Sequence, residues 1–400
     1  MERPLANVRL LVVEQYGAGP FGTQLLADLG AEVIKIENRR LGGDYARSLG
    51  PFYIDGVETS DRSLFFQAIN RNKKSVSLDL THPEGKSVFH ELVKTADAVA
   101  NNLRGDVPER LGLTYDDLAG VNPAIVCAHC SAYGREGPRK DWPGYDFLMQ
   151  AETGYFHMSG EPGTPPTRMG LSIVDFMGGT FMALGLLAGV FHARQTGVGR
   201  DVDVNLFDTA LSNLSYLSTW ALNTDYNPRR VHRSAHATMS PCQLYRTSDG
   251  WIFIMCNKEK FWSVLCRELG RDDLANDPRF LTFNERQQNR EELTRILDDA
   301  LSGRSTESWL KQLSGKVPVA PVRTPSEALN DPALEAAGKI QTLKVEGTGR
   351  EFRVLAPPIN THSVSEDHAC PPLGANTEDI LRGAGYSDIE IEQLRSNGAI

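Results

Sequence analysis

Two short apolar runs near the start of the chain limit its possible folds more than any other feature. Val8–Glu14 (VRLLVVE) and Glu32–Glu37 (EVIKIE) are expected to form buried strands, with a glycine-rich loop and a helical segment between them. Near-continuous apolar strands are typical of a parallel sheet that is covered on both faces. Two such strands joined by a helix form a β-α-β unit. The sequence therefore predicts an α/β fold.

The same alternation continues through the first half of the chain. A helix is expected to begin at Pro83, because proline is favoured in the first turn of a helix. Further strands are expected at 75–80, 98–101, 124–131 and from residue 201 onward. We therefore predict an open, doubly wound α/β domain over residues 1–205.

A second, smaller domain is predicted after a change in composition. Residues 223–239 are polar and carry several basic side chains, and residues 243–256 have the pattern of a β-hairpin. Helical segments follow, so residues 226–325 are predicted to form a small α+β domain. The segments 206–225 and 318–330 are predicted linkers, the second because its proline-rich start (PVAPV) favours an extended chain.

Charge and composition argue against several classes of partner. The 51 Asp and Glu residues outnumber the 42 Lys and Arg residues, the net charge is −9, and no basic block stands out. Neither a nucleic-acid nor a membrane partner is expected. The longest apolar segment, about 176–191, is interrupted by glycines and is predicted to be too short to span a bilayer. The start of the chain has no secretion-signal pattern, so we expect a cytoplasmic protein.

Most of the six cysteines lie in apolar segments and are expected to be buried thiols of a reducing compartment. Cys127 and Cys130 form a CxxC pair in a strand-like run, but no second pair lies at zinc-finger spacing. A buried, structural role is therefore favoured over metal binding, and no metal site is predicted.

A dinucleotide-binding fingerprint follows the first strand. Gly17, Gly19 and Gly22 have the G-x-G-x-x-G spacing, and Glu37 lies 20 residues beyond Gly17. One interpretation is an NAD site. Against it, Pro20 removes a backbone N–H from the turn that would hold the pyrophosphate. The alternative is a tight strand-to-helix turn that needs small residues for steric reasons.

Asp175 lies where a loop is expected to enter a long apolar helix, just before Gly178 and Gly179. Two interpretations apply. Asp is a preferred N-cap, whose side-chain oxygen accepts a free backbone N–H. Alternatively, Asp175 is a nucleophile or base that the positive end of the helix dipole keeps ionised. Local sequence alone favours the N-cap.

Several stretches together resemble one family. Val8–Gly22 followed by Leu29–Glu37 (LGAEVIKIE) looks like the opening of the class III CoA-transferases, the carnitine CoA-transferase and formyl-CoA transferase family. The later blocks that resemble the family are Asn70–Asp79 (NRNKKSVSLD), Pro108–Leu113 (PERLGL), Tyr133–Pro138 (YGREGP), Gly144–Asp146 (GYD), Gly170–Gly179, Thr196–Asp208 and Pro372–Thr377 (PLGANT).

This resemblance implies an interlocked homodimer whose subunits pass through one another like links of a chain. It implies a large Rossmann-like, CoA-binding domain built from both chain ends, here 1–205 with 330–400, and a smaller domain at 226–325. It implies no NAD and no tightly bound cofactor; coenzyme A and acyl-CoA are substrates, together with a carboxylic acid.

The resemblance also implies chemistry on Asp175, which falls at the position of the family's catalytic aspartate. The carboxylate forms a mixed anhydride with the donor acyl group and then an aspartyl-CoA thioester, from which CoA passes to the acceptor acid. On this interpretation the helix N-terminus keeps Asp175 ionised. Backbone N–H groups near Gly178 and Gly179 would stabilise oxyanions, unless the glycine pair only allows close helix packing.

The remaining site residues are assigned by match to the family blocks. The residues expected to bind CoA, mainly through its phosphates, are Arg39, Arg40, Arg71, Lys73, Lys74, Asn102, Arg104, Arg110 and Tyr133. The residues expected to line the substrate site are Tyr16, Gly17, Ala18, Tyr145 and His236.

Departures from the family pattern bear on the reaction. The related racemases carry His where Tyr145 stands, and Tyr is a poor proton exchanger at neutral pH, so transfer is favoured over racemisation. Gly17 stands where the formyl-CoA branch has Gln, which argues against an oxalate and formyl substrate pair. Arg47 and Arg168 are candidates for holding the second carboxylate of a dicarboxylic acid such as succinate. The alternatives are an acyl-CoA racemase or isomerase and a non-catalytic CoA-binding protein.

Overall fold

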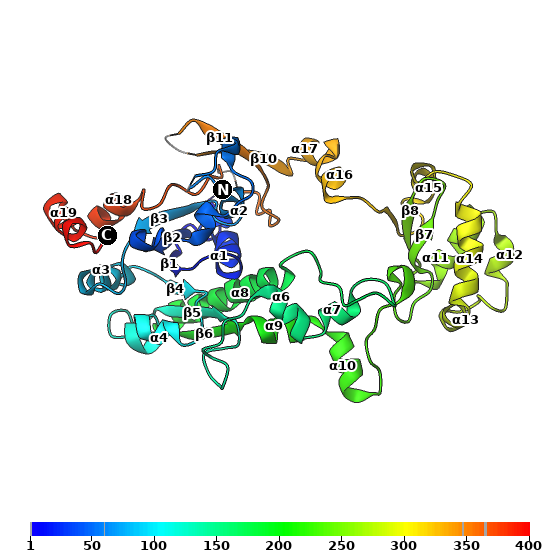
Figure 1. The fold of residues 1–400 in the computed structure, drawn as a ribbon, viewed down its shortest axis with the longest axis horizontal. Helices are drawn as coiled ribbons and strands as arrows, with labels where there is room; N and C mark the ends of the chain where they lie inside the picture. Colours follow the sequence, from blue (N-terminus) through cyan, green and yellow to red (C-terminus); the bar gives the residue numbers. More distant parts are fainter. Residues whose placement is uncertain (1, 60, 346–347, 364–365) are drawn as a thin grey trace. The chain divides into compact units, whose positions relative to one another are not determined.

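The computed structural model describes residues 2–59, 61–345, 348–363 and 366–400, and the chain divides into two compact units (Figure 1). The large unit comprises Met1–Thr153, Met169–Ser218 and Glu335–Ile400, and the small unit comprises Gly154–Arg168 and Thr219–Leu334. These boundaries differ from the predicted ones, since the small unit also takes in residues 219–225 and 326–334. Residues 154–168 belong to the small unit, and residues 206–218, predicted as part of a linker, belong to the large unit because helix α9 packs against α8 and β6.

The large unit is built on a six-stranded parallel sheet. Its strands are β1 (Arg9–Val13), β2 (Glu32–Glu37), β3 (Lys73–Ser77), β4 (Ala98–Asn101), β5 (Val126–Ser131) and β6 (Arg200–Asn205). They lie in the order β3-β2-β1-β4-β5-β6, and every pair is parallel. This is the strand order of a doubly wound α/β sheet, and the order reverses between β1 and β4.

Helices cover both faces of this sheet, as the apolar strands predict. On one face, α3 (Pro83–Val93), α18 (Thr377–Gly383) and α19 (Asp388–Asn397) bury apolar side chains against β1 to β5. On the other, α1 (Ala18–Asp28) packs on α8 (Ile173–Thr196), and α8 packs on β5 and β6. The α/β prediction is therefore confirmed. Because α18 and α19 come from the end of the chain, the large unit contains both chain ends.

Glycines set how closely α1 and α8 approach. A Cβ on Gly22 would lie 2.2 Å from the Gly179 carbonyl oxygen, and a Cβ on Gly179 would lie 2.2 Å from the Ala18 carbonyl oxygen. Gly178 instead faces the tip of the Leu206 side chain at 2.8 Å. Gly178 and Gly179 lie within α8, where their N–H groups belong to the helix ladder. The glycine pair therefore serves helix packing, and the oxyanion prediction for it is not supported.

The two neighbouring glycines give a matched stability test. We expect Gly179→Ala to lower the free energy of unfolding by about 3 kcal/mol, because backbone must move to admit the methyl group. Gly178→Ala should cost clearly less, because the Leu206 side chain can rotate away. Urea unfolding of both variants measures the difference, and equal losses would contradict this account of the helix crossing.

Helix α8 is longer than the sequence predicted. It runs without interruption for 24 residues and is long and apolar enough to span a membrane by length and composition, so the prediction that it is too short is wrong. Half of its most apolar window is buried within the protein. Leu184 and Phe191 are exposed on it. The contacts of α8 with α1, β5 and β6 are those of a core helix.

The remaining elements of the large unit are short. They are η1 (Arg39–Leu41), η2 (Tyr45–Ser48), η3 (Ile54–Gly56), α2 (Leu64–Ala68), α4 (Val107–Leu111), α5 (Tyr115–Leu118), α6 (Asp146–Glu152), α9 (Leu206–Asn213), and the antiparallel pair β10 (Ile340–Val345) and β11 (Arg350–Leu355).

The small unit has its own sheet and core. The predicted hairpin is present as β7 (Cys242–Arg246) and β8 (Trp251–Met255), and β9 (Val319–Pro321) adds a third antiparallel strand. The proline-rich run predicted as a linker is therefore part of this sheet. Its helices are α7 (Tyr155–Met158), α11 (Glu259–Glu268), α12 (Asp272–Ala275), α13 (Phe283–Gln288), α14 (Arg290–Leu301), α15 (Thr306–Leu313) and α16 (Pro325–Leu329), with η4 (His232–Ser234). Two helices, α10 (Tyr216–Asn223) and α17 (Pro332–Ala336), include residues of both units.

All six cysteines are free and buried. Cys127 belongs to the core on the α3 face, whereas Cys130 lies beside Gly178 of α8. Residues three apart on a strand point to opposite faces, so this CxxC pair cannot converge on one ion. Across the ranges that the structure describes, no group of three or more His, Cys, Asp or Glu side chains is placed to hold a metal.

Candidate functional site

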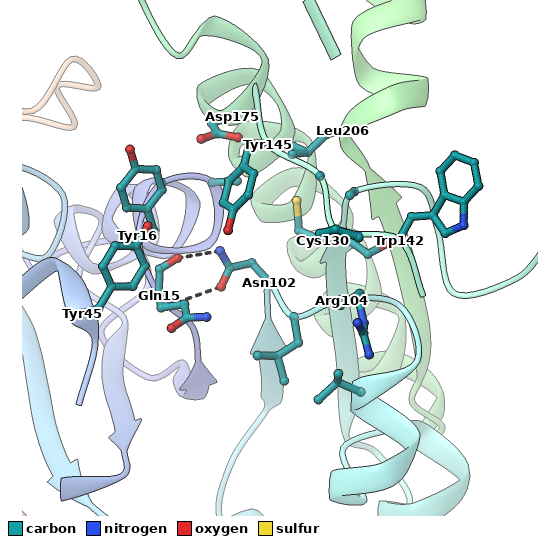
Figure 2. Close-up of a pocket in the computed structure, with 18 residues that line it drawn as sticks. Gln15, Tyr16, Tyr45, Asn102, Arg104, Cys130, Trp142, Tyr145, Asp175 and Leu206 are labelled. Atoms are coloured by element: carbon teal, nitrogen blue, oxygen red, sulfur yellow. Dashed lines mark hydrogen bonds between the residues drawn. The ribbon is translucent and has the colours of Figure 1, made fainter. Parts of the chain in front are cut away.

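A pocket of about 360 Å³ opens at the carboxyl ends of β1, β4 and β5 (Figure 2). Ligands of open α/β sheets bind at this edge, where the strand order reverses. Its lining residues are Gln15, Tyr16, Gly17, Ala18, Tyr45, Asn102, Leu103, Arg104, Val107, Cys130, Ser131, Ala132, Trp142, Pro143, Gly144, Tyr145, Asp175 and Leu206. The sheet therefore brings together segments that are far apart in the sequence.

Asp175 lies in the first turn of α8 and lines this pocket. The N-cap position is Ser172, so the prediction that Asp175 caps the helix is wrong. Asp146, at the start of α6, supplies the cap instead. Its Oδ2 accepts the backbone N–H of Val174 at 2.6 Å and of Asp175 at 3.0 Å. The Asp175 side chain is left to face the pocket.

The carboxyl group of Asp175 is held in an unusual electrostatic environment. It is buried, and burial raises its pKa to about 7, with the nearby negative charge of Asp146 adding to the rise. The helix dipole was expected to keep Asp175 ionised, but burial and Asp146 oppose that effect. The N–H groups that would have stabilised its charge are bonded to Asp146. Asp175 thus exchanges a proton near neutral pH.

The fingerprint glycines each allow a close approach. A Cβ on Gly17 would lie 2.4 Å from Asp175 Oδ2, and a Cβ on Gly19 would lie 2.8 Å from Asn102 Cγ. Asn102 is fixed in turn by Gln15, whose N–H it accepts at 2.9 Å and whose carbonyl it donates to at 2.7 Å (Figure 2). With Gly22 at the helix crossing, all three glycines are explained by contacts within the protein. The steric alternative to the NAD interpretation therefore accounts for the motif.

Tyr16 holds the turn that carries Gly17. Its φ of 66° lies in the left-handed region, which costs a bulky residue free energy. The Tyr16 N–H donates to Asp44 Oδ1 at 3.1 Å. Its ring stacks on Tyr45 with centroids 5.2 Å apart and on Phe65 with centroids 5.1 Å apart. These contacts fix an aromatic wall beside Asp175 (Figure 2).

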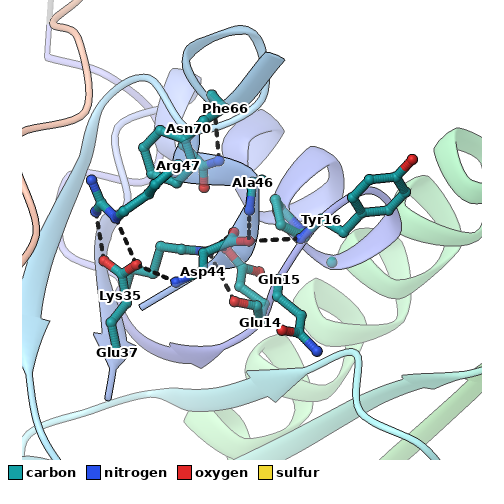
Figure 3. Close-up of polar contacts among 12 residues, drawn as sticks. Glu14, Gln15, Tyr16, Lys35, Glu37, Asp44, Ala46, Arg47, Phe66 and Asn70 are labelled. Atoms are coloured by element: carbon teal, nitrogen blue, oxygen red, sulfur yellow. Dashed lines mark hydrogen bonds and ion pairs between the residues drawn. The ribbon is translucent and has the colours of Figure 1, made fainter. Parts of the chain in front are cut away.

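A buried cluster of charges lies beside this turn and bonds to it (Figure 3). Lys35 Nζ lies 3.0 Å from Asp44 Oδ2 and donates to the Glu14 carbonyl at 2.9 Å. Lys73 Nζ lies 2.7 Å from Glu14 Oε1 and also donates to the Pro20 carbonyl. All four charged side chains are almost fully buried. The cluster thus ties the end of β1, the middle of β2 and the start of β3 to the Tyr16 turn.

Glu37, the acidic residue of the fingerprint, is engaged within the same region. It accepts two hydrogen bonds from Arg47, at 2.8 and 2.6 Å, and one from Ser75 (Figure 3). Burial acts to raise the pKa of Glu37, but the bonds and charge of Arg47 hold it at about 2. Arg47 also bonds Asp61, so it is not placed to hold a substrate carboxylate as predicted. Both side chains are structural here.

Seven of the predicted site residues line the pocket together: Asp175, Tyr16, Gly17, Ala18, Asn102, Arg104 and Tyr145. Tyr145 occupies the N-cap position of α6, next to Asp146, and in Figure 2 its ring lies between Asp175 and Asn102. Arg104 is paired with Asp106 by two hydrogen bonds, and Arg110 reaches the same Asp106 at 3.0 Å. These two arginines form a basic rim beside α4.

Other predicted cations are held by the protein itself. Arg71 is buried, bonds both oxygens of Asp28 and donates to the Leu355 carbonyl. Burial lowers the pKa of Lys73 to about 8, although the charge of Glu14 opposes this. Neither position suits contact with a phosphate, because both side chains are enclosed and satisfied. They connect α1 and β1 to neighbouring segments instead.

The last predicted CoA residues lie at the surface of the large unit. Lys74 pairs with Glu32 at 2.6 Å, and Arg39 donates to the Leu373 carbonyl. Arg40 acts on Asp79: burial tends to raise the pKa of Asp79, but the hydrogen bonds of Thr81, with a smaller contribution from the charge of Arg40, lower it. The Tyr133 hydroxyl donates to Glu152 at 3.1 Å. None of the four lines the Asp175 pocket.

His236 and Arg168 belong to the small unit. The Nδ1 atom of His236 accepts the backbone N–H groups of Thr238 and Met239, each at 3.2 Å. Burial lowers the pKa of His236, and the nearby charge of Arg290 lowers it further. His236 is therefore an ordered, neutral side chain in the loop before β7.

Sequence reasoning missed four residues that shape the site: Gln15, Tyr45, Asp44 and Asp146. The GYD block drew attention to Tyr145, and the aspartate that follows it was passed over. A carboxylate at the start of a helix was the available signal for Asp146. Asp44 gave no comparable signal, because its role depends on Lys35 and Tyr16 in space.

A second pocket of about 310 Å³ adjoins the first, since Gln15 and Leu103 line both. It lies at the carboxyl ends of β1, β2 and β3. Its lining includes the apolar side chains Ile36, Leu41, Leu78, Leu80, Leu103 and Leu111. The two pockets therefore lie next to each other along this edge of the sheet.

Comparison with known proteins places this geometry in context. The model of the family described as CoA-transferase family III matches residues 5–377. The chain is 37% identical to acetyl-CoA:oxalate CoA-transferase of Acetobacter aceti over 321 residues, which cover 80% of each chain. It is 30% identical to succinyl-CoA:glutarate CoA-transferase of Mus musculus, over 100% of this chain and 90% of the relative. Its fold is similar to that of a CAIB/BAIF family protein from Brucella suis, with a TM-score of 0.79, 29% identity, and coverage of 96% and 100%.

Proposed function

This chain belongs to CoA-transferase family III and is a CoA-transferase, and we propose that it moves CoA between dicarboxylic acids with Asp175 as the covalent carrier. The observation that carries the proposal is the placement of Asp175: a buried carboxylate on a helix N-terminus, at the carboxyl edge of the sheet, in a pocket that shares Gln15 and Leu103 with a second pocket.

The proposed reaction uses Asp175 as a nucleophile. An Asp175 oxygen attacks the carbonyl carbon of the donor thioester, the C–S bond breaks, and the electron pair leaves with the CoA thiolate. The thiolate then attacks the Asp175 carbonyl of this mixed anhydride and releases the donor acid. The acceptor carboxylate attacks the resulting aspartyl-CoA thioester, and the thiolate finally takes up the acceptor's acyl group. Each exchange conserves the energy of the thioester.

The two adjoining pockets suggest how CoA lies on the large unit. The second pocket has an apolar lining that suits a nucleobase, and the shared residues Gln15 and Leu103 lead from it to Asp175. Arg104 and Arg110 lie beside this path and are the proposed phosphate contacts. The thioester end of CoA would then reach Asp175 between Gly17 and Tyr145.

The choice of dicarboxylic acids rests on the relatives, which act on oxalate in one case and on succinyl-CoA and glutarate in the other. An oxalate enzyme among them weakens the argument from Gly17 against that acid. The racemase alternative is disfavoured by the family match and by the phenol of Tyr145 at the position where an imidazole is needed.

We also propose that the large unit is the Rossmann-like CoA domain of an interlocked homodimer. The strand order supports the first part. Exposed apolar side chains on α8 and α9, namely Leu184, Phe191 and Leu211, support the second, because such side chains are usually covered by a partner when they gather on neighbouring helices.

A substrate panel tests the proposed function. Succinyl-CoA is supplied with oxalate, glutarate, mesaconate, acetate or butyrate, and new thioesters are separated by chromatography. We expect at least one dicarboxylate to have a kcat/KM about tenfold or more above both monocarboxylates, because a second carboxylate adds a charge-assisted contact. Preference for acetate or butyrate would refute the dicarboxylate assignment and leave CoA transfer itself in place.

A further inference from the structure

The Asp146 carboxylate bonds the backbone of Asp175, although the transfer reaction itself uses only the Asp175 carboxylate. Both side chains are buried, at 3% and 6% exposure, and they come from different helices, α6 and α8. Asp146 Oδ2 takes the N–H groups of Val174 and Asp175, and its Oδ1 accepts the amide of Gln150 at 2.6 Å. A carboxylate that accepts three N–H bonds is strongly held in position.

We propose that Asp146 is a positioning residue for Asp175: it fixes the first turn of α8, and its negative charge disfavours the free Asp175 carboxylate relative to the covalent adducts. This inference rests on the proposed function, since it concerns the same nucleophile. The positioning of the first turn of α8 follows from the hydrogen bonds of Asp146. The effect of its negative charge follows from the charges that change during the reaction.

Acylation removes the charge of Asp175. When the carboxylate attacks the donor thioester, one C–O bond forms, one C–S bond breaks, and the negative charge leaves with the CoA thiolate. The mixed anhydride and the aspartyl-CoA thioester are both neutral at residue 175. Repulsion between Asp146 and Asp175 is therefore present only in the free enzyme. Asp146 raises the free energy of that state and favours the covalent intermediates.

The other groups that face Asp175 cannot supply this effect. Tyr16 and Tyr45 lie after β1 and β2, Tyr145 precedes α6, and Cys130 lies near the end of β5; burial and then the charge of Asp175 raise the pKa of Tyr16 and Cys130, and both also act on Tyr45. None of these side chains is a cation, and Arg104, which lines the same pocket, is paired with Asp106. The raised pKa of Asp175 comes first from burial and then from Asp146. Asp146 is thus the group whose charge can be removed without opening the pocket.

The pH dependence of acylation tests the proposal. Enzyme and a single equivalent of acyl-CoA are mixed, and released CoA is followed before the acceptor is added. In the wild type the rate should rise with pH through a midpoint near 7, because only ionised Asp175 attacks. In Asp146→Asn the midpoint should fall by about one unit. The rate at pH 6, as a fraction of its own plateau, then rises about fivefold, while the plateau falls because a less basic carboxylate is a weaker nucleophile.

Matched variants separate charge from capping. Asp146→Asn keeps an amide oxygen that can accept the α8 N–H groups. Asp146→Ala leaves those groups without this acceptor and should lower both the plateau and the thermal stability. Asp116→Asn makes the same chemical change on exposed α5, outside both pockets, and should keep the wild-type midpoint.

The outcomes are distinguishable. A midpoint that is the same in Asp146→Asn and the wild type overturns the role of Asp146 while the trapped adduct still supports the proposed function. A wild-type midpoint near pH 4 overturns the role of Asp146 without the use of any variant. This result covers the case in which Asp146→Asn does not fold. If the wild type releases no CoA and forms no adduct on Asp175 at any pH, the proposed function fails, and this inference with it.

Discussion

Asp175→Ala should abolish CoA transfer. A methyl group can form neither the anhydride nor the thioester, so the covalent route has no first step, and the transfer rate should fall by about 10⁴-fold or more. Coupled assays with a saturating donor and acceptor measure this loss. Hydroxylamine trapping followed by peptide mass spectrometry should label the peptide that contains Asp175 in the wild type and leave it unlabelled in the variant.

Asp175→Asn is the control for folding. The pKa of Asp175 in the folded protein lies near 7, above its ordinary value, so the folded state binds this proton more tightly than the unfolded state. The stability that this group contributes is complete at acidic pH and is lost as the pH rises through 7. A neutral amide escapes that loss. We therefore expect the melting temperature of Asp175→Asn at pH 8 to equal or exceed that of the wild type, whereas activity is lost.

A transfer rate above about 1% of the wild type in Asp175→Ala would contradict the covalent mechanism. So would a trapped adduct on another residue, such as Cys130 at the pocket wall. Burial raises the pKa of the Cys130 thiol to about 12, which makes it a poor nucleophile at neutral pH. Asp175 is therefore the better assignment on chemical grounds as well as by position.

The sheet could be predicted because its strands are encoded locally. β2 and β4 begin and end where the apolar runs do, and the β-α-β order follows from short connections. The order of all six strands was not predicted, because it depends on pairs such as Leu10 with Ala98 that are distant in sequence. Within the site, Asp175 and the Tyr16–Ala18 turn were found through motifs.

The charged residues show why the rest could not be predicted. β3 was expected at 75–80 but forms at Lys73–Ser77, and this shift places Lys73 inside the sheet. A lysine in a polar block suggests a solvated cation. Its partner, Glu14, lies 59 residues earlier, and only the fold reveals that Lys73 is enclosed. Arg71 and Arg47 were misassigned for the same reason, because Asp28 and Glu37 neutralise them.

The pKa of Asp175 likewise depends on contacts that the local sequence does not reveal. A helix N-terminus alone predicts a stabilised carboxylate with a low pKa. The structure reverses that expectation, because a second carboxylate from α6 occupies the N–H groups first. The residue was thus found from its place in a motif, but its protonation depends first on burial and then on a neighbour 29 positions away. Local sequence patterns predict the helices and strands well, but they predict the interactions between side chains of different elements poorly.

Gly17→Ala should impair catalysis without unfolding the protein. The added Cβ would lie 2.4 Å from Asp175 Oδ2, so the carboxylate or the Tyr16 turn must move by about 1 Å or more to restore contact distance. A displacement of that size at a nucleophile lowers kcat by about 10²-fold. Gly17 has a φ of −98°, outside the left-handed region that favours glycine, so the loss would come from the contact and not from a left-handed backbone.

Gly120→Ala is the matched control for this change. Gly120 also has an ordinary backbone conformation, and a Cβ there would meet no atom within 4 Å, so its kcat should equal that of the wild type. Steady-state kinetics and thermal melting of both variants decide the matter. If Gly17→Ala keeps kcat within about threefold of the wild type, then Asp175 is not held against Gly17 during turnover. If kcat falls while the melting temperature is unchanged, the fingerprint glycine acts by seating the catalytic carboxylate, a role that a nucleotide-binding loop does not have.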